Sequence, residues 1–456
     1  MYVCGPTVYD EPHIGPARSA YIFDVIRRYL SGKYEVTFVR NVTDVDDKII
    51  EKAKKESKDS EEISKKYLDA YHEDMDLLRI GRPDKEPLAT EYIPRMVKFI
   101  GILIEKGCAY ESAGDVYFDI KKAKDYGKLS NQNIEKMEAG ARVAAGQIKK
   151  DPLDFALWKK AKEGEPSWGS PWGAGRPGWH IECSAMSSDI LGDEFDIHGG
   201  GVDLIFPHHE NEIAQSEGAG KAFARYWIHN GLLTINNEKM AKSLGNFISI
   251  KSMLEKYPEE ASSDILKDFF LTAHYSGPID FSEKAMNDSK TAIHGLLETL
   301  KADKNIRNLS KLAEKNREYI DVFKNEFIRG MDDNFNMPVA RASIYEIARY
   351  CNRILGGKKT PEAEAAVQHG INTIRELGKI LGLSLNKLNN HDPKWGDLSI
   401  VNIFKIEEIE DKIQQRNKAR QEKDFKKADQ IRKELFDKGI VLEDTKEGKT
   451  EWRPRN

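Results

Sequence analysis

The sequence predicts an α/β protein with a parallel sheet that is interrupted by an insertion and followed by a helical region. Three observations support this prediction. Residues 1–40 alternate strand, helix and strand, a second α/β stretch covers 179–235, and apolar residues recur at helical spacing from about residue 260. Together they indicate a split α/β domain that precedes a helical bundle and a small C-terminal unit.

Length and composition limit the classes of protein to consider. The 456 residues, 39% of them hydrophobic, suffice for two to four domains. No run of about 18 apolar residues is present, and the N-terminus lacks a basic stretch followed by an apolar one, so we expect no membrane span and no secretory signal. Four distant cysteines favour a reducing cytoplasm. The net charge of -4 means that local patches must hold any polyanionic partner.

The first elements form a βαβ unit. Tyr2-Val-Cys is a short apolar strand, and a helix carries Ile22, Val25, Ile26 and Tyr29 at helical spacing. A second strand is expected over Tyr34–Arg40, where β-branched and aromatic residues dominate. Ligands of parallel sheets collect at the carboxyl ends of strands, which points to residues 4–15 and 41–44.

Later segments complete the predicted order. Phe195-Asp-Ile is expected as a strand, with three glycines after it, and Glu210 to Gln215 as the opening of a helix. An insertion of roughly 85–170 ends in a loop rich in tryptophan and glycine. One buried helix face is predicted from the spacing of Ala340, Ile344, Ile347, Cys351 and Ile354.

A basic segment near the C-terminus has two interpretations. Residues 412–433 carry nine lysines and arginines, and we expect a linker before them at 389–393. Such a helix is typical of a solvated surface, and it also suits a phosphate backbone.

His13-Ile-Gly-Pro16 lies where the first strand turns into the first helix. A helix N-terminus offers free N–H groups to a polyphosphate, and Gly15 would allow the chain to pass close to a nucleotide. His13 could donate to a phosphoryl oxygen. The same residues also fit an ordinary helix start with Pro16 in its first turn.

Two lysines form a second candidate. Lys239-Met-Ala-Lys242-Ser-Leu-Gly-Asn246 places Lys239 and Lys242 in a loop that suits a clamp on phosphates. Alone, the segment is more typical of a solvated loop.

A metal site is the third candidate. His208 and Glu212 are spaced i and i+4, so on a helix they share a face, and Cys183 would add a thiolate. Cys4, at the end of the first strand, could complete a tetrahedral zinc site. The alternative is two buried structural cysteines beside a polar helix start. Cys108 and Cys351 are expected to be structural.

Taken together, these residues resemble a cysteinyl-tRNA synthetase, a class I aminoacyl-tRNA synthetase, over nearly the whole chain. The most specific strings are Tyr2-Val-Cys-Gly-Pro-Thr-Val-Tyr-Asp10, Asn41-Val-Thr-Asp-Val-Asp-Asp-Lys48, Gly175-Arg-Pro-Gly-Trp-His-Ile-Glu-Cys-Ser-Ala-Met186 and Phe195-Asp-Ile-His-Gly-Gly-Gly201 with Phe206-Pro-His-His-Glu-Asn-Glu212.

The resemblance implies roles for individual residues. The family's HIGH signature falls on 13–16 and its KMSKS loop on 239–243, which makes His13, Gly15, Lys239 and Lys242 the expected catalytic residues, with His13, Gly15 and Lys242 binding ATP. The zinc ligands fall on Cys4, Cys183, His208 and Glu212. Thr43 and Trp179 match positions that line the cysteine pocket, and we expect Gly5 and His198 to bind substrate beside them.

The implied organisation is a Rossmann-like catalytic domain in two halves, 1–84 and 171–235, around a connective insertion at 85–170. The KMSKS loop and stem-contact region (236–260), a helical anticodon-binding bundle (261–392) and a small charged C-terminal domain (393–456) follow. The implied reaction ligates L-cysteine to tRNA-Cys through cysteinyl-adenylate, with one Zn²⁺ per chain selecting the thiolate and Mg²⁺ accompanying ATP. The chain is expected to be cytoplasmic and monomeric.

Three departures from the family pattern are visible. Pro16 replaces the usual histidine or asparagine, Ala241 replaces the central serine of KMSKS, and the chain begins inside the first strand, which suggests a misassigned or truncated start. Two rival functions remain at this stage. A cysteine ligase acting on an aminosugar should lack the bundle and the basic tail, and a non-catalytic zinc- or RNA-binding paralogue should not activate cysteine.

Overall fold

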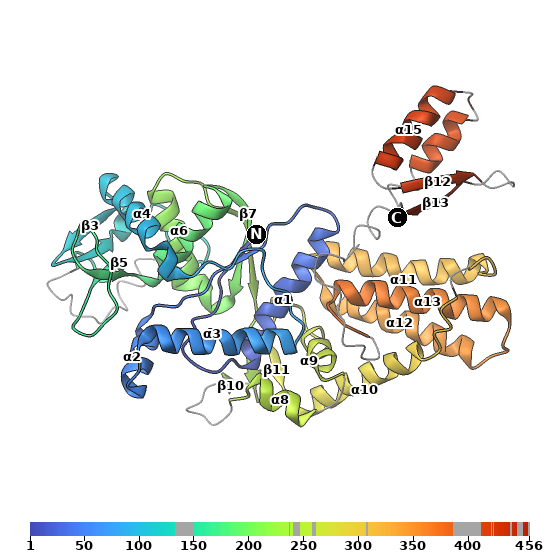
Figure 1. The fold of residues 1–456 in the computed structure, drawn as a ribbon, viewed down its shortest axis with the longest axis horizontal. Coiled ribbons are helices and arrows are strands. Elements are labelled where there is room, and N and C mark those ends of the chain that lie inside the picture. Colours follow the sequence, from blue (N-terminus) through green and yellow to red (C-terminus); the bar gives the residue numbers. More distant parts are fainter. Residues whose placement is uncertain are drawn as a thin grey trace. The chain divides into compact units, whose positions relative to one another are not determined.

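The computed structural model describes most of the chain. It covers residues 1–132, 149–236, 238–239, 247–257, 261–306, 309–385, 412–420, 422, 424–437, 440–444 and 450–454. The chain divides into two compact units, one of Met1–Arg27 with Val36–Asn390 and one of Arg28–Glu35 with His391–Asn456. Figure 1 shows the elements and their labels.

A parallel sheet forms the centre of the first unit. Its strands are β1 (Tyr2–Val3), β2 (Val39–Arg40), β7 (Phe195–Gly201) and β8 (Ala224–Asn230), in the order β2-β1-β7-β8. β1 is therefore an inner strand between β2 and β7. The predicted split parallel sheet is confirmed.

Two strand predictions need correction. The strand expected over Tyr34–Arg40 is reduced to β2, because its partner β1 is only two residues long and the N–H of Phe38 is bonded to the Asp84 carboxylate instead. The three glycines expected after a strand lie inside β7. A Cβ at Gly199 would lie 2.3 Å from the ring of Phe23, so the glycine lets α1 (Ile14–Ser31) pack directly on the sheet.

Helices surround this sheet. The predicted apolar face of α1 is buried, and α6 (Trp179–Leu191) packs against α7 (Glu210–Gly218). Two short helical turns, η3 (Val202–Leu204) and η4 (Ile205–His209), connect β7 to α7. A separate apolar cluster joins α2 (Asp47–Glu56) and α3 (Ser60–Leu77) to the residues after β1 and β2.

The insertion has a sheet of its own. After η1 (Ala89–Tyr92) and α4 (Ile93–Glu105), four antiparallel strands follow in the order β3-β4-β5-β6. They are β3 (Ala109–Ser112), β4 (Asp115–Phe118), β5 (Phe155–Lys160) and β6 (Gly175–Pro177), with η2 (Ile120–Lys122) after β4. One hydrophobic core contains residues of this sheet and of the parallel sheet, including Trp158 and Tyr2. The insertion is thus packed onto the parallel sheet through a common core.

A three-stranded sheet follows β8. Its strands are β9 (Leu233–Ile235), β10 (Glu238–Lys239) and β11 (Ile279–Phe281), in the order β10-β9-β11. β10 pairs antiparallel and β11 parallel with β9. The helices α8 (Ile250–Lys256) and α9 (Ser262–Phe270) lie between β10 and β11 in the sequence.

The predicted helical region is confirmed. It contains α10 (Glu283–Leu300), α11 (Glu314–Asp332), α12 (Met337–Leu355) and α13 (Pro361–Ile380), of which α11, α12 and α13 run side by side (Figure 1). Ala340, Ile344, Ile347 and Cys351 are buried on one face of α12, and Ile354 at its end is partly buried. A Cβ at Gly370 would lie 2.3 Å from the Cys351 sulfur, so Cys351 is a packing residue. No helix in the described part of the chain is long and apolar enough to cross a membrane.

Among the described residues from 412 onward, the second unit contains two helices and a hairpin. Helix 412–420 and α15 (Phe425–Asp437) pack with β12 (Ile440–Asp444), which pairs with β13 (Thr450–Pro454). The basic segment is therefore two helices and not one. Its side chains are also not all solvated, because Arg416 is buried and donates to Thr450 and Lys412 pairs with Glu434.

Candidate metal centre and nucleotide site

The carboxyl ends of β1 and β2 come together as the parallel sheet predicts. The Cys4 N–H donates to the Gly199 carbonyl at 3.0 Å, and the Gly5 N–H donates to Asn41 Oδ1 at 3.0 Å. A Cβ at Gly5 would lie 1.6 Å from the Asn41 carbonyl oxygen, so only glycine permits this approach. Cys4 is thereby held at the strand end.

Four side chains of the kinds that bind zinc converge there. Ligand atoms of Cys4, Cys183, His208 and Glu212 all lie within 4.8 Å of one another. The two sulfurs are 3.7 Å apart, Cys4 Sγ is 3.7 Å from Glu212 Oε1, and His208 Nε2 is 3.0 Å from the same oxygen. Two sulfurs bound at about 2.3 Å to one tetrahedral zinc lie about 3.8 Å apart, so the residues fit this metal.

Electrostatics in this cluster differ from one ligand to the next. Burial and the hydrogen bond with Cys183 raise the pKa of Cys4 well above its usual value. Burial opposes the Cys183 thiolate, but the Cys4 contact and His208 outweigh it and lower the pKa of Cys183 to about 6. Burial opposes the His208 imidazolium, but Glu212 and Cys183 raise its pKa to about 10. Without a metal, His208 is thus a cation between a thiolate and a carboxylate.

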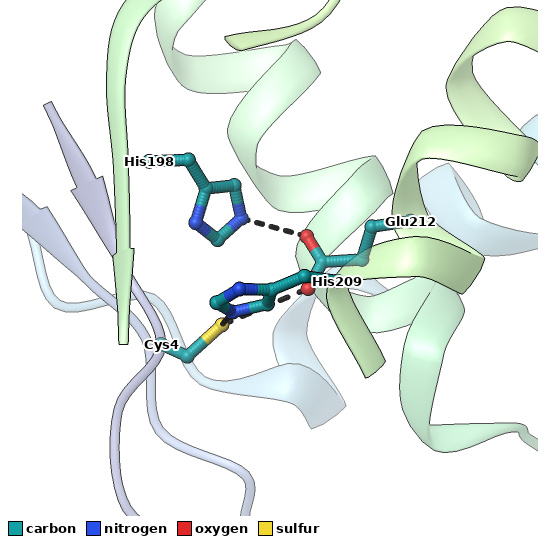
Figure 2. Close-up of side chains that lie close together, drawn as sticks. All are labelled: Cys4, His198, His209 and Glu212. Atoms are coloured by element: carbon teal, nitrogen blue, oxygen red, sulfur yellow. Dashed lines mark hydrogen bonds and ion pairs between the residues drawn. The ribbon is translucent and has the colours of Figure 1, made fainter. Parts of the chain in front are cut away.

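A second donor set adjoins the first. Cys4, His198, His209 and Glu212 also lie within 4.8 Å of one another (Figure 2). His198 Nε2 is 2.8 Å from Glu212 Oε2, and His209 Nε2 is 3.3 Å from Cys4 Sγ. Both imidazoles are fully buried. Sequence reasoning missed His209, although it is adjacent to His208 in the chain. His198 contacts the second carboxylate oxygen of Glu212, Oε2, whereas His208 contacts Oε1.

The two residues expected in a cysteine pocket lie around this cluster. Thr43 is buried and donates from Oγ1 to Glu182 Oε2 at 2.7 Å, and burial raises the pKa of Glu182 well above its usual value. The Trp179 ring lies 4.1 Å from the His208 ring, and 37% of this tryptophan is exposed. Trp179 is therefore a partly exposed side chain next to the cluster.

His13 lies immediately before α1, as predicted, but the helix start is not a free N–H cradle. The Ile14 N–H donates to the Ile248 carbonyl at 3.3 Å, and the Gly15 N–H donates to His13 Nδ1 at 3.2 Å. Pro16, exposed in the first turn, has no N–H. Because Nδ1 accepts a hydrogen bond, a neutral His13 carries its proton on Nε2.

The structure describes only one of the two candidate lysines. Lys239 ends β10, and Lys242 and Ala241 lie outside the described residues. The segment that follows them returns to α1, where Ser249 forms a bridge with His13 and the Phe247 ring lies 5.3 Å from the His13 ring. His13 and the C-terminal flank of the lysine segment are therefore neighbours.

This architecture defines a class I aminoacyl-tRNA synthetase. It combines a split parallel sheet, a helix that begins directly after a histidine, and a helical domain that follows in the sequence. The family model described as "tRNA synthetases class I (C) catalytic domain" matches residues 1–291. A DALR domain matches 326–386, and a "Cysteinyl-tRNA ligase anticodon binding domain" matches 407–453. Full-length relatives narrow the class further.

The chain belongs to the cysteine–tRNA ligase family. It is 48% identical to the cysteine–tRNA ligase of Geobacter metallireducens, with 99% of this chain and 94% of that protein covered. It is 46% identical to the enzyme of that name from Coxiella burnetii, with the same coverage. The resemblance inferred from the sequence motifs is confirmed.

Solved structures share the fold at low identity. Methionyl-tRNA synthetase of Mycobacterium tuberculosis in complex with methionyl-adenylate aligns with a TM-score of 0.62 at 16% identity, covering 84% of this chain and 90% of that one. A putative arginyl-tRNA synthetase of Campylobacter jejuni aligns with a TM-score of 0.57 at 14% identity, covering 84% and 93%. These likenesses support the class I fold.

Proposed function

We propose that this protein attaches L-cysteine to tRNA-Cys in two steps. The carboxylate of cysteine attacks the α-phosphorus of ATP, which forms cysteinyl-adenylate and expels pyrophosphate. A hydroxyl of the terminal ribose of the tRNA then attacks the cysteinyl carbonyl, and AMP leaves. The observation that carries this proposal is the cluster of two cysteines, a histidine and a glutamate at the strand ends of a class I fold.

Selection of cysteine is assigned to the metal cluster. A zinc ion held by Cys4, Cys183, His208 and Glu212 would supply a Lewis acid that binds the substrate's sulfur and lowers the pKa of its thiol. The chain contributes the enclosure, since these ligands are nearly all buried and Trp179 borders them. A site built on one specific contact rejects an analogue that lacks it by about 10⁴–10⁵, so no hydrolytic editing site is expected in the insertion.

Activation of ATP is assigned to the start of α1 and to the lysine segment. His13, with its proton on Nε2, would donate to a phosphoryl oxygen as negative charge develops. Gly15 supplies the N–H that fixes this tautomer. Lys239 and Lys242 are proposed to stabilise the departing pyrophosphate, and Mg²⁺ is expected to accompany ATP. Thr43, Trp179, Gly5 and His198 are proposed to shape the cysteine pocket.

Recognition of tRNA is assigned to the C-terminal parts. We propose that the bundle at 261–392 and the small unit at 393–456 bind the anticodon arm, supported by the anticodon-binding description of the model that matches 407–453. The rival aminosugar ligase would need neither part. We propose a cytoplasmic monomer, and four unpaired cysteines are consistent with a reducing compartment.

The test is cysteine-dependent ATP–pyrophosphate exchange combined with charging of tRNA-Cys. The purified protein should catalyse both, and Cys183→Ser should lose cysteine affinity and zinc while ATP affinity stays unchanged. Cys108→Ser is the matched control, because Cys108 lies outside the cluster, with its sulfur near the Gly218 carbonyl. Exchange without charging would favour the aminosugar ligase. Neither activity, or normal zinc and cysteine binding by Cys183→Ser, would contradict the proposal.

A further inference from the structure

Arg18 is a buried cation in the second turn of α1. Its side chain is inaccessible to solvent, and burial lowers its pKa to about 10, so it remains charged at neutral pH. The hydrogen bonds of its two terminal nitrogens reach only main-chain oxygens among the described residues. An arginine buried without a carboxylate is costly, because carbonyl dipoles alone must replace its hydration.

The two terminal nitrogens of the Arg18 guanidinium donate hydrogen bonds to two separate segments. Nη1 donates to the carbonyls of Gly231 and Leu232, at 2.6 and 3.0 Å. Nη2 donates to those of His274, Tyr275 and Gly277, at 3.4, 3.3 and 2.8 Å. Each nitrogen therefore holds one segment, and the planar fork fixes the spacing between them.

Both segments lead directly into the three-stranded sheet. Residues 231–232 precede β9, and residues 274–277 precede β11. β9 pairs with β10, which ends at Lys239. The two segments also touch by backbone alone, since a Cβ at Gly231 would lie 2.1 Å from the Gly277 carbonyl oxygen. Arg18 thus holds the residues that lead into β9 and β11, the sheet from whose strand β10 the lysine segment, residues 239–246, begins.

The other flank of that segment is tied to the same helix. The Ile248 carbonyl accepts from the Ile14 N–H, and Ser249 bridges His13. Main-chain contacts hold this flank, whereas Arg18 holds the sheet from which the segment departs. His13 precedes Arg18 by five residues, so the two phosphate-binding elements are connected through one rigid helix.

We propose that Arg18 is a positioning residue for adenylate formation, which sets the sheet that carries Lys239 relative to His13 at the start of α1. This inference rests on the proposed function. It assigns Arg18 no contact with substrate, and it predicts an effect on the chemical step and none on cysteine selection.

The experiment compares three variants of the full-length zinc-loaded protein. Arg18→Met removes the charge, and Arg18→Lys keeps it as a single point that cannot serve both segments. The matched control is Lys267→Met, because Lys267 is another fully buried cation that donates to main-chain oxygens, those of Arg79 and Gly382. Melting temperature, zinc content, cysteine KM and the kcat of pyrophosphate exchange are measured below the melting transition of every variant.

Both methionine variants should melt at lower temperature than the parent, but only the Arg18 variants should lose kcat. Arg18→Lys should recover much of the melting temperature while its kcat stays at least about tenfold low, since a displacement of about 1 Å can cost 10²-fold. Cysteine KM and zinc content should remain within about twofold of the parent, because the metal cluster is built from the end of β1 and from α6, η4 and α7, none of which Arg18 contacts.

Several results would overturn the role of Arg18. One is a kcat of Arg18→Lys equal to that of the parent protein. Another is a loss of kcat in Lys267→Met as large as that in the Arg18 variants. The third is an Arg18→Lys chain that does not fold, which would show that Arg18 is needed only for folding. A parent protein without exchange would instead overturn the proposed function, and the role of Arg18 with it.

Discussion

Gly5→Ala tests whether the approach of two strand ends builds the cysteine site. The new Cβ would lie 1.6 Å from the Asn41 carbonyl oxygen, whereas real Cβ atoms do not come within 3.0 Å of a heavy atom from elsewhere in the chain. The Cys4–Gly5 segment and residue 41 must therefore separate by about 1.4 Å. Overpacking of this kind typically costs about 1–3 kcal/mol of stability.

The functional cost should exceed the loss of stability. Cys4 is the preceding residue, and Thr43 follows Asn41 by two, so the separation moves a proposed zinc ligand away from a proposed pocket residue. A misplacement of about 1 Å can cost about 10²-fold. We expect the cysteine Kd to rise by about that factor and zinc content to fall, while the ATP Kd remains near that of the parent.

Isothermal titration with cysteine, and metal analysis of the purified variant, provide the measurement. Gly101→Ala in α4 is the control, because nothing lies within 4 Å of its Cβ position, and a helical Gly→Ala change is neutral or stabilising by about 1 kcal/mol. Parent-like cysteine affinity and full zinc occupancy in Gly5→Ala would refute the argument.

Four further outcomes are expected. Zinc binding should release about two protons near pH 7.5, because Cys4 and His208 are protonated without metal. Zinc affinity should therefore rise by about 10²-fold per pH unit from pH 7 towards 9. Calorimetric titration in buffers of different ionisation enthalpy measures the proton release, and a zinc affinity that does not change with pH would contradict the prediction. Lys242→Ala should slow adenylate formation by about 10²–10³ with an unchanged cysteine Kd, as rapid-quench kinetics would show. Deleting residues after 395 should spare pyrophosphate exchange but weaken tRNA charging and reduce its dependence on salt. Pro16→His should accelerate adenylation by about tenfold, because it restores an N–H and adds a side-chain donor in the first turn of α1; an unchanged rate would show that this position faces no phosphate.

Local patterns allowed the metal cluster to be predicted in part. The i, i+4 spacing of His208 and Glu212 is a property of one helix, and the rule that parallel strands end at one edge placed Cys4 nearby. The contacts of His198 and His209 with this cluster could not be predicted this way. Which neighbours His198 and His209 face depends on how β7, η4 and α7 pack, and that packing is not encoded in a local period.

The fold shows the same division between local and distant information. The face of α12 followed from spacing alone, whereas the sheet of the insertion depends on pairings such as Phe118 with Phe155, which join residues far apart in sequence. Tyr34–Arg40 has strand propensity along its whole length, yet only Val39 and Arg40 pair with β1, because β1 is only two residues long. The helix start before Pro16 also differs from the expected cradle, since Ile248 and His13 already occupy its N–H groups.

The position of β1 between β2 and β7 has a consequence for biosynthesis. Cys4 and Glu212 are separated by 208 positions. At about 5–20 residues per second, Cys4 leaves the ribosome roughly 10–40 s before the last of its partners. During that interval β1 lacks its neighbour β7, so its edge is open to other strands. The Cys4 thiol also lacks the other side chains of the metal cluster. Until about half of the chain has been synthesised, the edge of β1 is thus exposed to aggregation, and the proposed zinc site can be completed only after that point.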